Sequence, residues 1–388
     1  MITDIRRSLL DDATHNDFAG FDPFDGLNAR LFDVFPRLRN SLFGLAWIQI
    51  FKRSNINMRH LLGVPKKRNP KGVALFISGM LEQYQTSHET HLLEEAQKLA
   101  DWLLEHQCCS KTWGASCWGY HFDWKARAFF VPKGKPNVIS TIYVSRALFD
   151  LGKLTNNQRY VDAACSSAEF IVEHLYTEDQ QRQFFAYIPG EKAFVHNARL
   201  WAAAWVGFVG SETDNAKYQE LARTVAWQSI NEQSPDGSWV YGARSHHQFI
   251  DGFHTGYNLE ALYELKHSLQ TDEFDESIDH GLVYYKAHLF EEDGTAKYYN
   301  NNRYPLDPHS VAQAVITLIK VGGEQDDLDM AGKVLNWSVK ELYLSDKKQF
   351  VYQKTARTTN AINYVRWTQA WMYLSMSIYL KNQKGEKS

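Results

Sequence analysis

Two acid–histidine pairs mark corresponding points along this sequence. Asp251 precedes His254 by three residues, and a second pair, Asp307 with His309, precedes another apolar stretch. At a helix N-terminus the dipole stabilises a carboxylate as the anion. The same field lowers the pKa of a histidine, which keeps a neutral imidazole available as a base. With the neighbouring tyrosines, one of them a helical turn beyond His254, the candidate catalytic residues are Asp251, His254, Tyr257, Tyr304, Asp307 and His309.

A plainer interpretation of these pairs stays open. Asp251 and Asp307 could act only as N-caps, which accept hydrogen bonds from free backbone N–H groups, with the histidines as packed donors. Two carboxylates flanking one bond would instead indicate a glycoside hydrolase, with Asp123, Asp251 and Asp307 as the candidates.

Aromatic and polar residues gather in the segments before the apolar stretches. The segment 113–130 is the richest, and aromatic faces carried on loops suit the apolar faces of pyranose rings. The alternative is that these rings only pack onto the hydrophobic core at the end of the fold where the loops lie. The candidate substrate-binding residues are Trp118, Tyr120, His121, Asp123, Trp124, Asn137, His196, Trp239, Arg244, Arg303 and Tyr364.

Basic residues lie in the same segments. Arg244, Arg303 and Arg366 are examples, and the stretch 52–71 contains more. Gathered at one mouth, they would favour an anionic substrate, although solvated loop charge explains them equally well.

The elements that must position these residues repeat along the chain. Apolar helices are predicted to open at intervals of 59, 58, 55 and 55 residues, from Asn137, His196, His254, His309 and Tyr364. A period of this size indicates one supersecondary unit used repeatedly. A further buried helix is predicted at 71–84, preceded by an amphipathic one near 37–52.

Amphipathic helices with charged outer faces alternate with these apolar ones. They are predicted at 88–107, 157–176, 215–233, 274–290 and 327–344. Outer-to-inner connections are long and hold short strand signals, so the inner-helix N-termini should carry the functional residues. The predicted fold is an all-α (α/α)6 toroid of about twelve alternating outer and inner helices, with short β hairpins at one end. Residues 1–36 form an N-terminal extension packing on the toroid, 37–381 a single domain and 382–388 a disordered tail.

One turn motif has a structural interpretation. The stretch QSPDGSWVYG (233–242) fits the Gln-x-x-x-Gly-x-Trp turn that recurs in double-ring terpene cyclases. There the Gln caps a helix and the Trp packs on it, the roles expected for Gln233 and Trp239. A cyclase would also need an acid cluster of the DDxxD type, which the sequence lacks.

Composition excludes several other classes. The net charge of −3 and the pI near 6.6 provide no general attraction to nucleic acid. The sequence 1–18 lacks the apolar region of a secretory signal, and no apolar run is long enough for a membrane span. The four cysteines show neither a disulfide framework nor a metal spacing. We therefore expect a cytoplasmic protein without a metal or cofactor.

Four stretches carry a resemblance to a known family. FDPFDGLNARLF (21–32), RSNINMRHLLGVPKKRNPKGVALFISG (53–79), IDGFHTGYNLEALYEL (250–265) and YPLDPHSVAQAVITL (304–318) resemble bacterial proteins encoded in exopolysaccharide and capsule gene clusters. The resemblance spans about residues 20–380 and implies an α/α toroid involved in polysaccharide biosynthesis. More distantly, FHTGYNLEAL is similar to the helical domain of glucuronyl C5-epimerases, where a toroid rich in Tyr and His handles a uronic polysaccharide.

These observations predict a carbohydrate-active protein of exopolysaccharide or capsule biosynthesis. The leading chemistry is epimerase- or lyase-type proton abstraction on an anionic, uronic acid-containing glycan, because His and Tyr outnumber acids at the helix openings. The alternatives are a glycoside hydrolase with paired carboxylates, and a non-catalytic glycan-binding or scaffold protein. The expected partner is an oligo- or polysaccharide, which could be lipid- or nucleotide-linked, and other polysaccharide-assembly proteins are further candidates.

Overall fold

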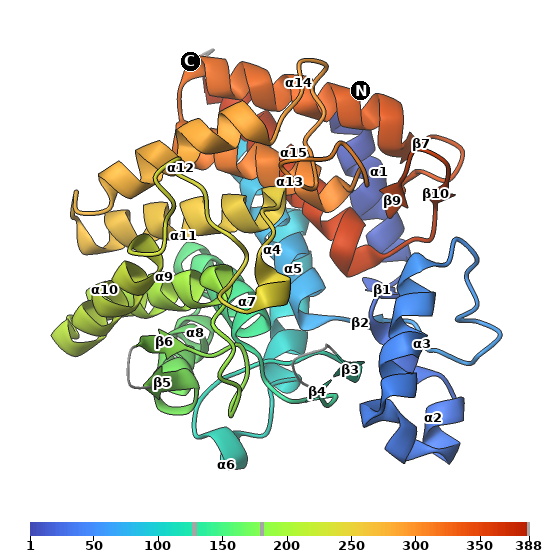
Figure 1. Ribbon diagram of the computed structural model, residues 1–388, viewed down its shortest axis with the longest axis horizontal. Coiled ribbons are helices and arrows are strands. Elements are labelled where there is room, and N and C mark those ends of the chain that lie inside the picture. Colours follow the sequence, from blue (N-terminus) through green and yellow to red (C-terminus); the bar gives the residue numbers. More distant parts are fainter. Residues whose placement is uncertain (126–129, 179–181, 386–388) are drawn as a thin grey trace.

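Six inner helices form a closed ring in the computed structural model, which describes residues 1–125, 130–178 and 182–385. Each inner helix contacts the next, and the last contacts the first, so the ring closes (Figure 1). Their small and apolar residues are buried on most sides, as a helix flanked by others on every side requires. The inner helices are α4 (Pro70–Ser87), α7 (Val138–Thr155), α9 (His196–Glu212), α11 (Gly252–Leu269), α13 (Pro308–Thr317) and α15 (Ala370–Gly385).

Six outer helices cover this ring. Each buries one stripe at helical spacing; in α5, for example, Leu92, Ala96, Leu99 and Leu103 are buried while the charged residues between them face outward. Short turns join each of the first five inner helices to the outer helix that follows it, and α1 covers α15, so the predicted (α/α)6 toroid is confirmed. The outer helices are α1 (Ile2–His15), α5 (Thr90–Glu105), α8 (Gln158–Phe170), α10 (Ala216–Ile230), α12 (Asp275–His288) and α14 (Gln325–Leu342).

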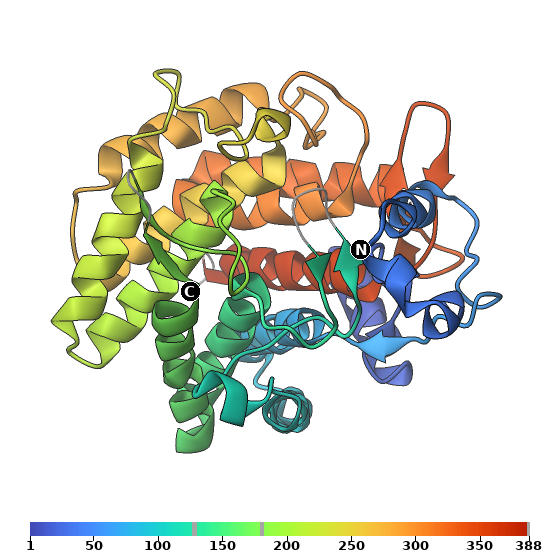
Figure 2. The same cartoon turned by 60° about the horizontal axis from the view of Figure 1, so that its bottom comes forward.

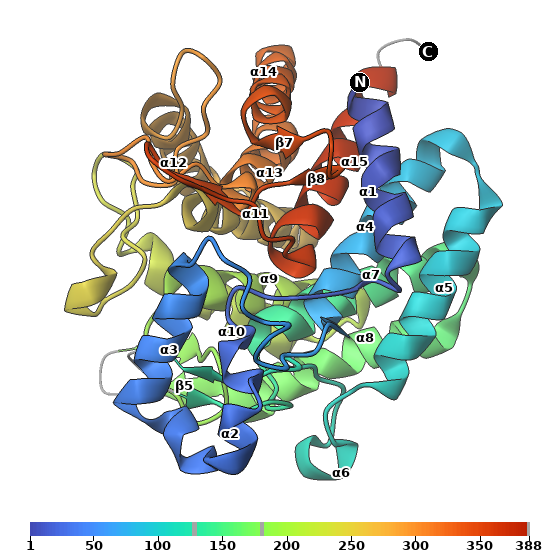
Figure 3. The ribbon, with the colours of Figure 1, turned by 90° about the vertical axis from the view of Figure 1, so that its right-hand side faces the viewer.

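The sixth outer helix differs from the sequence prediction. The helix predicted near 37–52 exists as α3 (Leu42–Arg53), but α1, and not α3, packs on α15 as the sixth outer helix (Figure 3). The reason is the connection 16–69, which joins an outer helix to an inner one like the other long connections. Within it α2 (Leu31–Val34) and α3 lie beside the inner-helix N-termini. At the other terminus α15 runs to Gly385, past the predicted start of the tail at residue 382, and residues 386–388 lie outside the described part.

Short antiparallel strand pairs occupy the long outer-to-inner connections, as predicted. Figure 2 shows one of them, β3 with β4, beside the segment that contains α3, which β3 contacts. The pairs are β1 (Ala19–Gly20) with β2 (Lys67–Arg68), β3 (Trp124–Lys125) with β4 (Phe130–Val131), β5 (Tyr176–Glu178) with β6 (Gln183–Phe185), β7 (Tyr343–Leu344) with β8 (Gln349–Phe350), and β9 (Gln353–Lys354) with β10 (Thr359–Asn360). The short helix α6 (Ser110–Trp113) lies in the connection to α7.

Close helix contacts depend on two glycines. A Cβ at Gly79 of α4 would lie 2.6 Å from the ring of Tyr373 in α15, and a Cβ at Gly256 of α11 would lie 2.7 Å from Oγ1 of Thr317 in α13. Both distances are shorter than real Cβ contacts allow. Glycine therefore sets the approach of neighbouring inner helices at two interfaces of the ring.

The structural role expected for the Gln-x-x-x-Gly-x-Trp turn is confirmed. Nε2 of Gln233 donates to the carbonyl oxygens of Gly237 and Ser277, at 2.9 and 3.0 Å, which ties the turn to α12. Nε1 of Trp239 donates to the carbonyl oxygen of Ser229 near the end of α10, and the Trp239 side chain is buried. In the described part of the chain, no helix has both the length and the apolar character that crossing a membrane requires.

Candidate active site

A cavity of about 290 Å³ lies at the N-terminal ends of the inner helices. Helix N-caps fix the surrounding backbone: Asn69, Asn137, Asp251 and Asp307 each accept a hydrogen bond from a backbone N–H in the first turn of their helix. Side chains from α4, α7, α9, α11 and α13, from the turn before α15 and from the long connections line the cavity. The regular spacing of the inner helices along the sequence predicts that their N-terminal ends come together in this way.

Asp251 and His254 form a dyad at the start of α11. One carboxylate oxygen of Asp251 accepts the backbone N–H of His254 at 2.8 Å, and the other lies 2.7 Å from its Nδ1. Asp251 is buried, whereas His254 lines the cavity and its side chain is 21% exposed. The carboxylate is therefore both the N-cap and the partner of the imidazole. This contact leaves Nε2 of His254 as the nitrogen available for proton transfer.

Tyr257 and His309 form a second pair across the α11–α13 interface. The Tyr257 hydroxyl lies 2.5 Å from Nε2 of His309, and Nδ1 of His309 has no hydrogen-bond partner among the described residues. The imidazole lies between the rings of Phe253 and Trp371, at centroid distances of 4.9 and 4.7 Å, which fixes its plane. Burial lowers the pKa of His309 well below its usual value, and the nearby Lys71 and Arg366 act in the same direction. Burial also raises the pKa of Tyr257 well above its usual value, so both groups are held neutral.

Three basic side chains line the same cavity: Arg366, Lys71 and Lys52. Arg366 makes a two-pronged ion pair with Asp22, which raises its pKa although burial opposes the charge. Lys71 is buried and has no carboxylate within ion-pair distance among the described residues. Its Nζ lies 4.3, 5.0 and 5.6 Å from the ring centroids of Tyr143, Trp371 and Tyr257. Burial, together with Arg366, lowers the pKa of Lys71 well below its usual value.

Lys52 is the third basic side chain. It reaches the cavity from α3, with Nζ 5.0 Å from the centroid of the Phe24 ring, and burial lowers its pKa. Among the described residues, no Asp or Glu side chain lines the cavity. The cavity thus combines basic side chains with neutral proton-transfer groups, a combination suited to an anionic ligand.

Asp307 is placed differently from Asp251. Its carboxylate accepts the backbone N–H of His309 at 2.8 Å and Nε2 of Gln353 at 2.7 Å, with Nε1 of Trp367 at 3.4 Å. It therefore bonds the backbone of His309 and not the imidazole. Burial raises the pKa of Asp307 to about 6, although these hydrogen bonds oppose the shift. The two acid–histidine pairs of the sequence are thus one imidazole dyad and one N-cap.

Aromatic rings form the cavity walls. Tyr120 and Trp124, both predicted for substrate binding, line it, and the hydroxyl of Tyr120 lies 2.7 Å from that of Tyr187. Phe122 stacks on Tyr120 with an interplanar angle of 6°. These walls offer flat apolar faces beside the polar groups, the usual character of a small-molecule site.

The other predicted substrate-binding residues lie outside the cavity lining, each held by a structural contact. Trp118 donates to the carbonyl oxygen of Leu103. His121 contacts Asn69, and Asp123 pairs with Arg39. Asn137 caps α7. The remaining ones are the buried His196, which contacts Arg199; Trp239 in its turn; Arg244, paired with Glu191; Arg303, paired with Glu291 and Asp293; and Tyr364, packed on Tyr352.

Of the six predicted catalytic residues, three line the cavity: His254, Tyr257 and His309. Asp251 and Asp307 lie directly behind two of them, and Tyr304 lies outside the lining. The sequence did not single out Lys71 and Lys52 as site residues, although they lie at the ends of its basic stretch 52–71. Trp367 and Phe249 also line the cavity without having been identified.

A basic hollow adjoins the cavity and shares Tyr120 with it. Lys66, Lys67 and Lys133 line this hollow without carboxylate partners among the described residues, whereas Arg68 pairs with Asp17. The rings of Trp102 and Tyr120 lie along the same surface. No group of His, Cys, Asp and Glu side chains in the described part of the chain could hold a metal ion.

Comparisons with known proteins bear on the fold. No protein-family model matches the sequence, and no curated protein matches it either. Among solved structures, an unsaturated glucuronyl hydrolase specific for heparin is similar, with a TM-score of 0.62 at 11% identity over 84% of this chain and 89% of that one. A sugar epimerase from a ruminal bacterium gives 0.62 at 13% identity, over 83% and 90%. A polysaccharide lyase gives 0.58 at 12% identity, over 82% and 91%.

Proposed function

We propose that this protein binds an anionic, uronic acid-containing glycan and transfers a proton at the carbon next to the uronate carboxylate. One observation carries the proposal. The Asp251–His254 dyad and the Tyr257–His309 pair open on a single cavity that is lined by basic side chains and, among the described residues, by no carboxylate. This arrangement fits proton abstraction from an anionic substrate better than hydrolysis by two carboxylates.

The proposed reaction begins at His254. Its Nε2 removes the C5 proton while Asp251 holds Nδ1, and the C–H electron pair moves toward the uronate carboxylate. Lys71 and Arg366 stabilise the charge that develops there. Tyr257, backed by His309, supplies the second proton-transfer group. Return of a proton to the opposite face of C5 gives the epimer, whereas loss of the substituent at C4 gives an unsaturated product.

The burial of Lys71 without a counter-ion supports recognition of a carboxylate. A buried ammonium without a counter-ion is costly, which is why its pKa is lowered. A substrate carboxylate beside Nζ would restore the charge and form a charge-assisted hydrogen bond. The basic hollow next to the cavity offers three more lysines for an anionic chain that extends beyond the reacting unit.

The proposed class of enzyme and its pathway rest on the similar structures and on the sequence resemblance. The three similar structures carry the names of a glucuronyl hydrolase, a sugar epimerase and a polysaccharide lyase. Together with the sequence resemblance to capsule-cluster proteins, these names support a carbohydrate-active enzyme of polysaccharide assembly. We place it in the cytoplasm, acting on a free, lipid-linked or nucleotide-linked glycan.

The test is exchange of the C5 hydrogen. Glucuronic acid oligosaccharides would be incubated with the protein in D₂O and followed by NMR, together with ultraviolet absorbance for a C4=C5 double bond. Deuterium at C5 with inversion indicates an epimerase, and the double bond indicates a lyase. His254→Ala should abolish exchange without unfolding, and Tyr263→Phe on the same helix should leave it unchanged. Binding without exchange in the wild-type protein would instead identify a non-catalytic glycan-binding protein.

A further inference from the structure

A second pocket opens at the opposite mouth of the toroid, toward the C-terminal halves of the inner helices. Its volume is about 240 Å³, and all six inner-helix segments contribute to its lining. A thin partition separates it from the catalytic cavity. Tyr143 and Trp371 line the second pocket, and both of their rings contact Lys71 on the other side. The toroid is therefore hollow from both ends.

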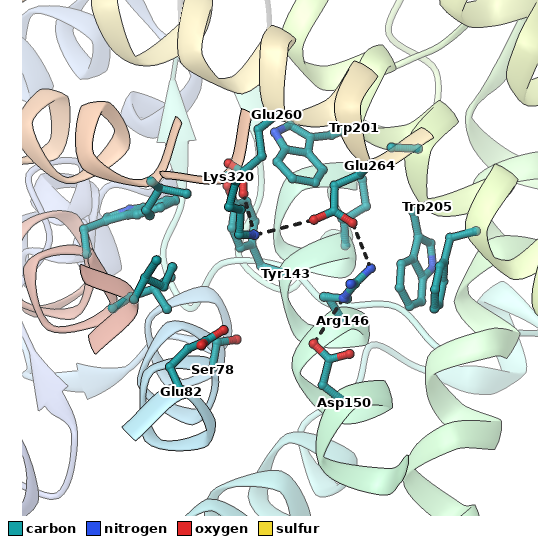
Figure 4. Close-up of a pocket in the computed structure, with 17 residues that line it drawn as sticks. Ser78, Glu82, Tyr143, Arg146, Asp150, Trp201, Trp205, Glu260, Glu264 and Lys320 are labelled. Atoms are coloured by element: carbon teal, nitrogen blue, oxygen red, sulfur yellow. Dashed lines mark hydrogen bonds and ion pairs between the residues drawn. The ribbon is translucent and has the colours of Figure 1, made fainter. Parts of the chain in front are cut away.

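The charges at this mouth are the reverse of those in the catalytic cavity. Four carboxylates line the pocket, against two cations. Lys320 bridges Glu260 and Glu264 at 2.8 and 3.5 Å, and Arg146 bridges Glu264 and Asp150 at 3.3 and 3.1 Å (Figure 4). The fourth carboxylate, Glu82, pairs with Lys381 through one oxygen. This excess of carboxylates opposes the entry of an anion.

The pocket also offers an unused hydrogen-bond donor and flat walls. Nε1 of Trp201 is enclosed and has no hydrogen-bond partner among the described residues. Only one oxygen of Asp150 is engaged by Arg146, which leaves an acceptor. Trp201 and Trp205 present indole rings along one side of the ion-pair network (Figure 4). Donors, acceptors and apolar faces thus converge on one small space.

We infer that this pocket is a second binding site, for an uncharged sugar. Sugar hydroxyls both donate and accept, so they can pair with the Trp201 indole and with carboxylate oxygens of the lining. The apolar face of a pyranose ring matches an indole ring, and a neutral ring avoids the repulsion that a uronate would meet. The site is distinct from the catalytic cavity, and the inference does not depend on the proposed reaction.

The experiment measures binding of D-glucose, D-glucosamine and D-glucuronate to the full chain by ligand-observed NMR titration. Trp201→Phe keeps the ring but removes the unpaired donor. Trp227→Phe, on the outer helix α10, is the matched control, and Lys71→Met disables the catalytic cavity. Thermal unfolding of each variant verifies that it is folded. We expect glucose to bind the wild-type protein, Trp227→Phe and Lys71→Met equally, and Trp201→Phe about 3- to 10-fold more weakly.

Several results would overturn the inference. The inference is wrong if glucose does not bind the wild-type protein. It is also wrong if glucose binds Trp201→Phe as tightly as it binds the wild-type protein. Loss of glucose binding in Lys71→Met would place the sugar in the catalytic cavity instead. Tighter binding of glucosamine or of glucuronate than of glucose would show that the ligand is charged. C5 exchange is measured separately on the wild-type protein, so a failure of this site is distinguishable from a failure of the proposed function.

Discussion

The phenol oxygen of Tyr257 lies 2.5 Å from Nε2 of His309, although the two residues are 52 positions apart. They meet because α11 and α13 are neighbours in the inner ring. Burial raises the pKa of the tyrosine and lowers that of the histidine, so the O–H donates to a neutral imidazole. The pair is a hydrogen-bond donor and acceptor held at the wall of the candidate active-site cavity.

Tyr257→Phe should therefore remove proton transfer while preserving the wall. We expect C5 exchange to fall by about 10²- to 10⁴-fold, the range typical of a positioned acid or base. The measurement is deuterium uptake by NMR under saturating glycan. Tyr263→Phe, also on α11 but outside the cavity lining, is the control. Unchanged exchange in Tyr257→Phe would remove this tyrosine from the proposed mechanism.

Asp251→Asn separates the two roles of that carboxylate. Asparagine is as good an N-cap as aspartate, so α11 should keep its first turn. The imidazole loses its anionic partner, and we expect kcat to drop by about 10-fold or more with little change in KM. Asp236→Asn, at an exposed turn, is the matched control. Equal kcat in Asp251→Asn and wild type would leave the carboxylate as an N-cap only.

Lys71→Met tests recognition of the substrate charge. Loss of one charge-assisted hydrogen bond should weaken uronate binding by about 10- to 100-fold. Because the pKa of the free lysine is lowered, uronate binding to the wild-type protein should take up a proton above that lowered pKa. Calorimetry in buffers of different ionisation enthalpy measures this uptake. Equal proton uptake by the wild-type protein and by Lys71→Met on uronate binding would show that Lys71 is not the group that takes up the proton.

Asp307 predicts a pH dependence of stability. Its pKa is raised from 3.8 to about 6, so between these values the folded state holds a proton that the unfolded state has released. This contribution is fully present below pH 3.8 and is lost as pH rises through about 6, amounting to at most about 3 kcal/mol.

Asp307→Asn should flatten that dependence while preserving the cap. Urea unfolding of both proteins between pH 4 and about 7 would measure the free energy of unfolding. The buried Asp25, whose pKa is raised to about 7, titrates in both proteins, so the difference between them isolates Asp307. If the free energy of unfolding changed with pH in the same way in both proteins, Asp307 would not be the source of the dependence.

The sequence was sufficient for the toroid because the signal is periodic. Helical spacing of apolar residues, repeated at nearly constant intervals, predicts both the helices and the end at which their openings meet. It was not sufficient for the sixth outer helix. Both α1 and α3 are amphipathic, and only the contact of α1 with α15 decides which one covers the ring.

The sequence identified residues that line the cavity where chemistry and spacing coincide. His254 and Tyr257 follow from one helix turn, and His309 follows from the repeat. Trp118 and Trp239 have the residue type expected for sugar binding but donate to backbone oxygens inside the structure. The sequence does not distinguish Lys71 from the lysines near it. Its burial without a counter-ion depends on three helices that pack around it, which only the structure shows.

The contact between α1 and α15 has a consequence for synthesis on the ribosome. The inner ring closes only when α15 packs against α4, and α1 covers α15 from outside; both helices precede α15 by most of the chain. A nascent polypeptide that lacks α15 leaves the faces of α4, α13 and α1 that contact it uncovered. Closure of the ring thus depends on contacts of long sequence separation, which are slow to form, and it must wait until α15 has been synthesised.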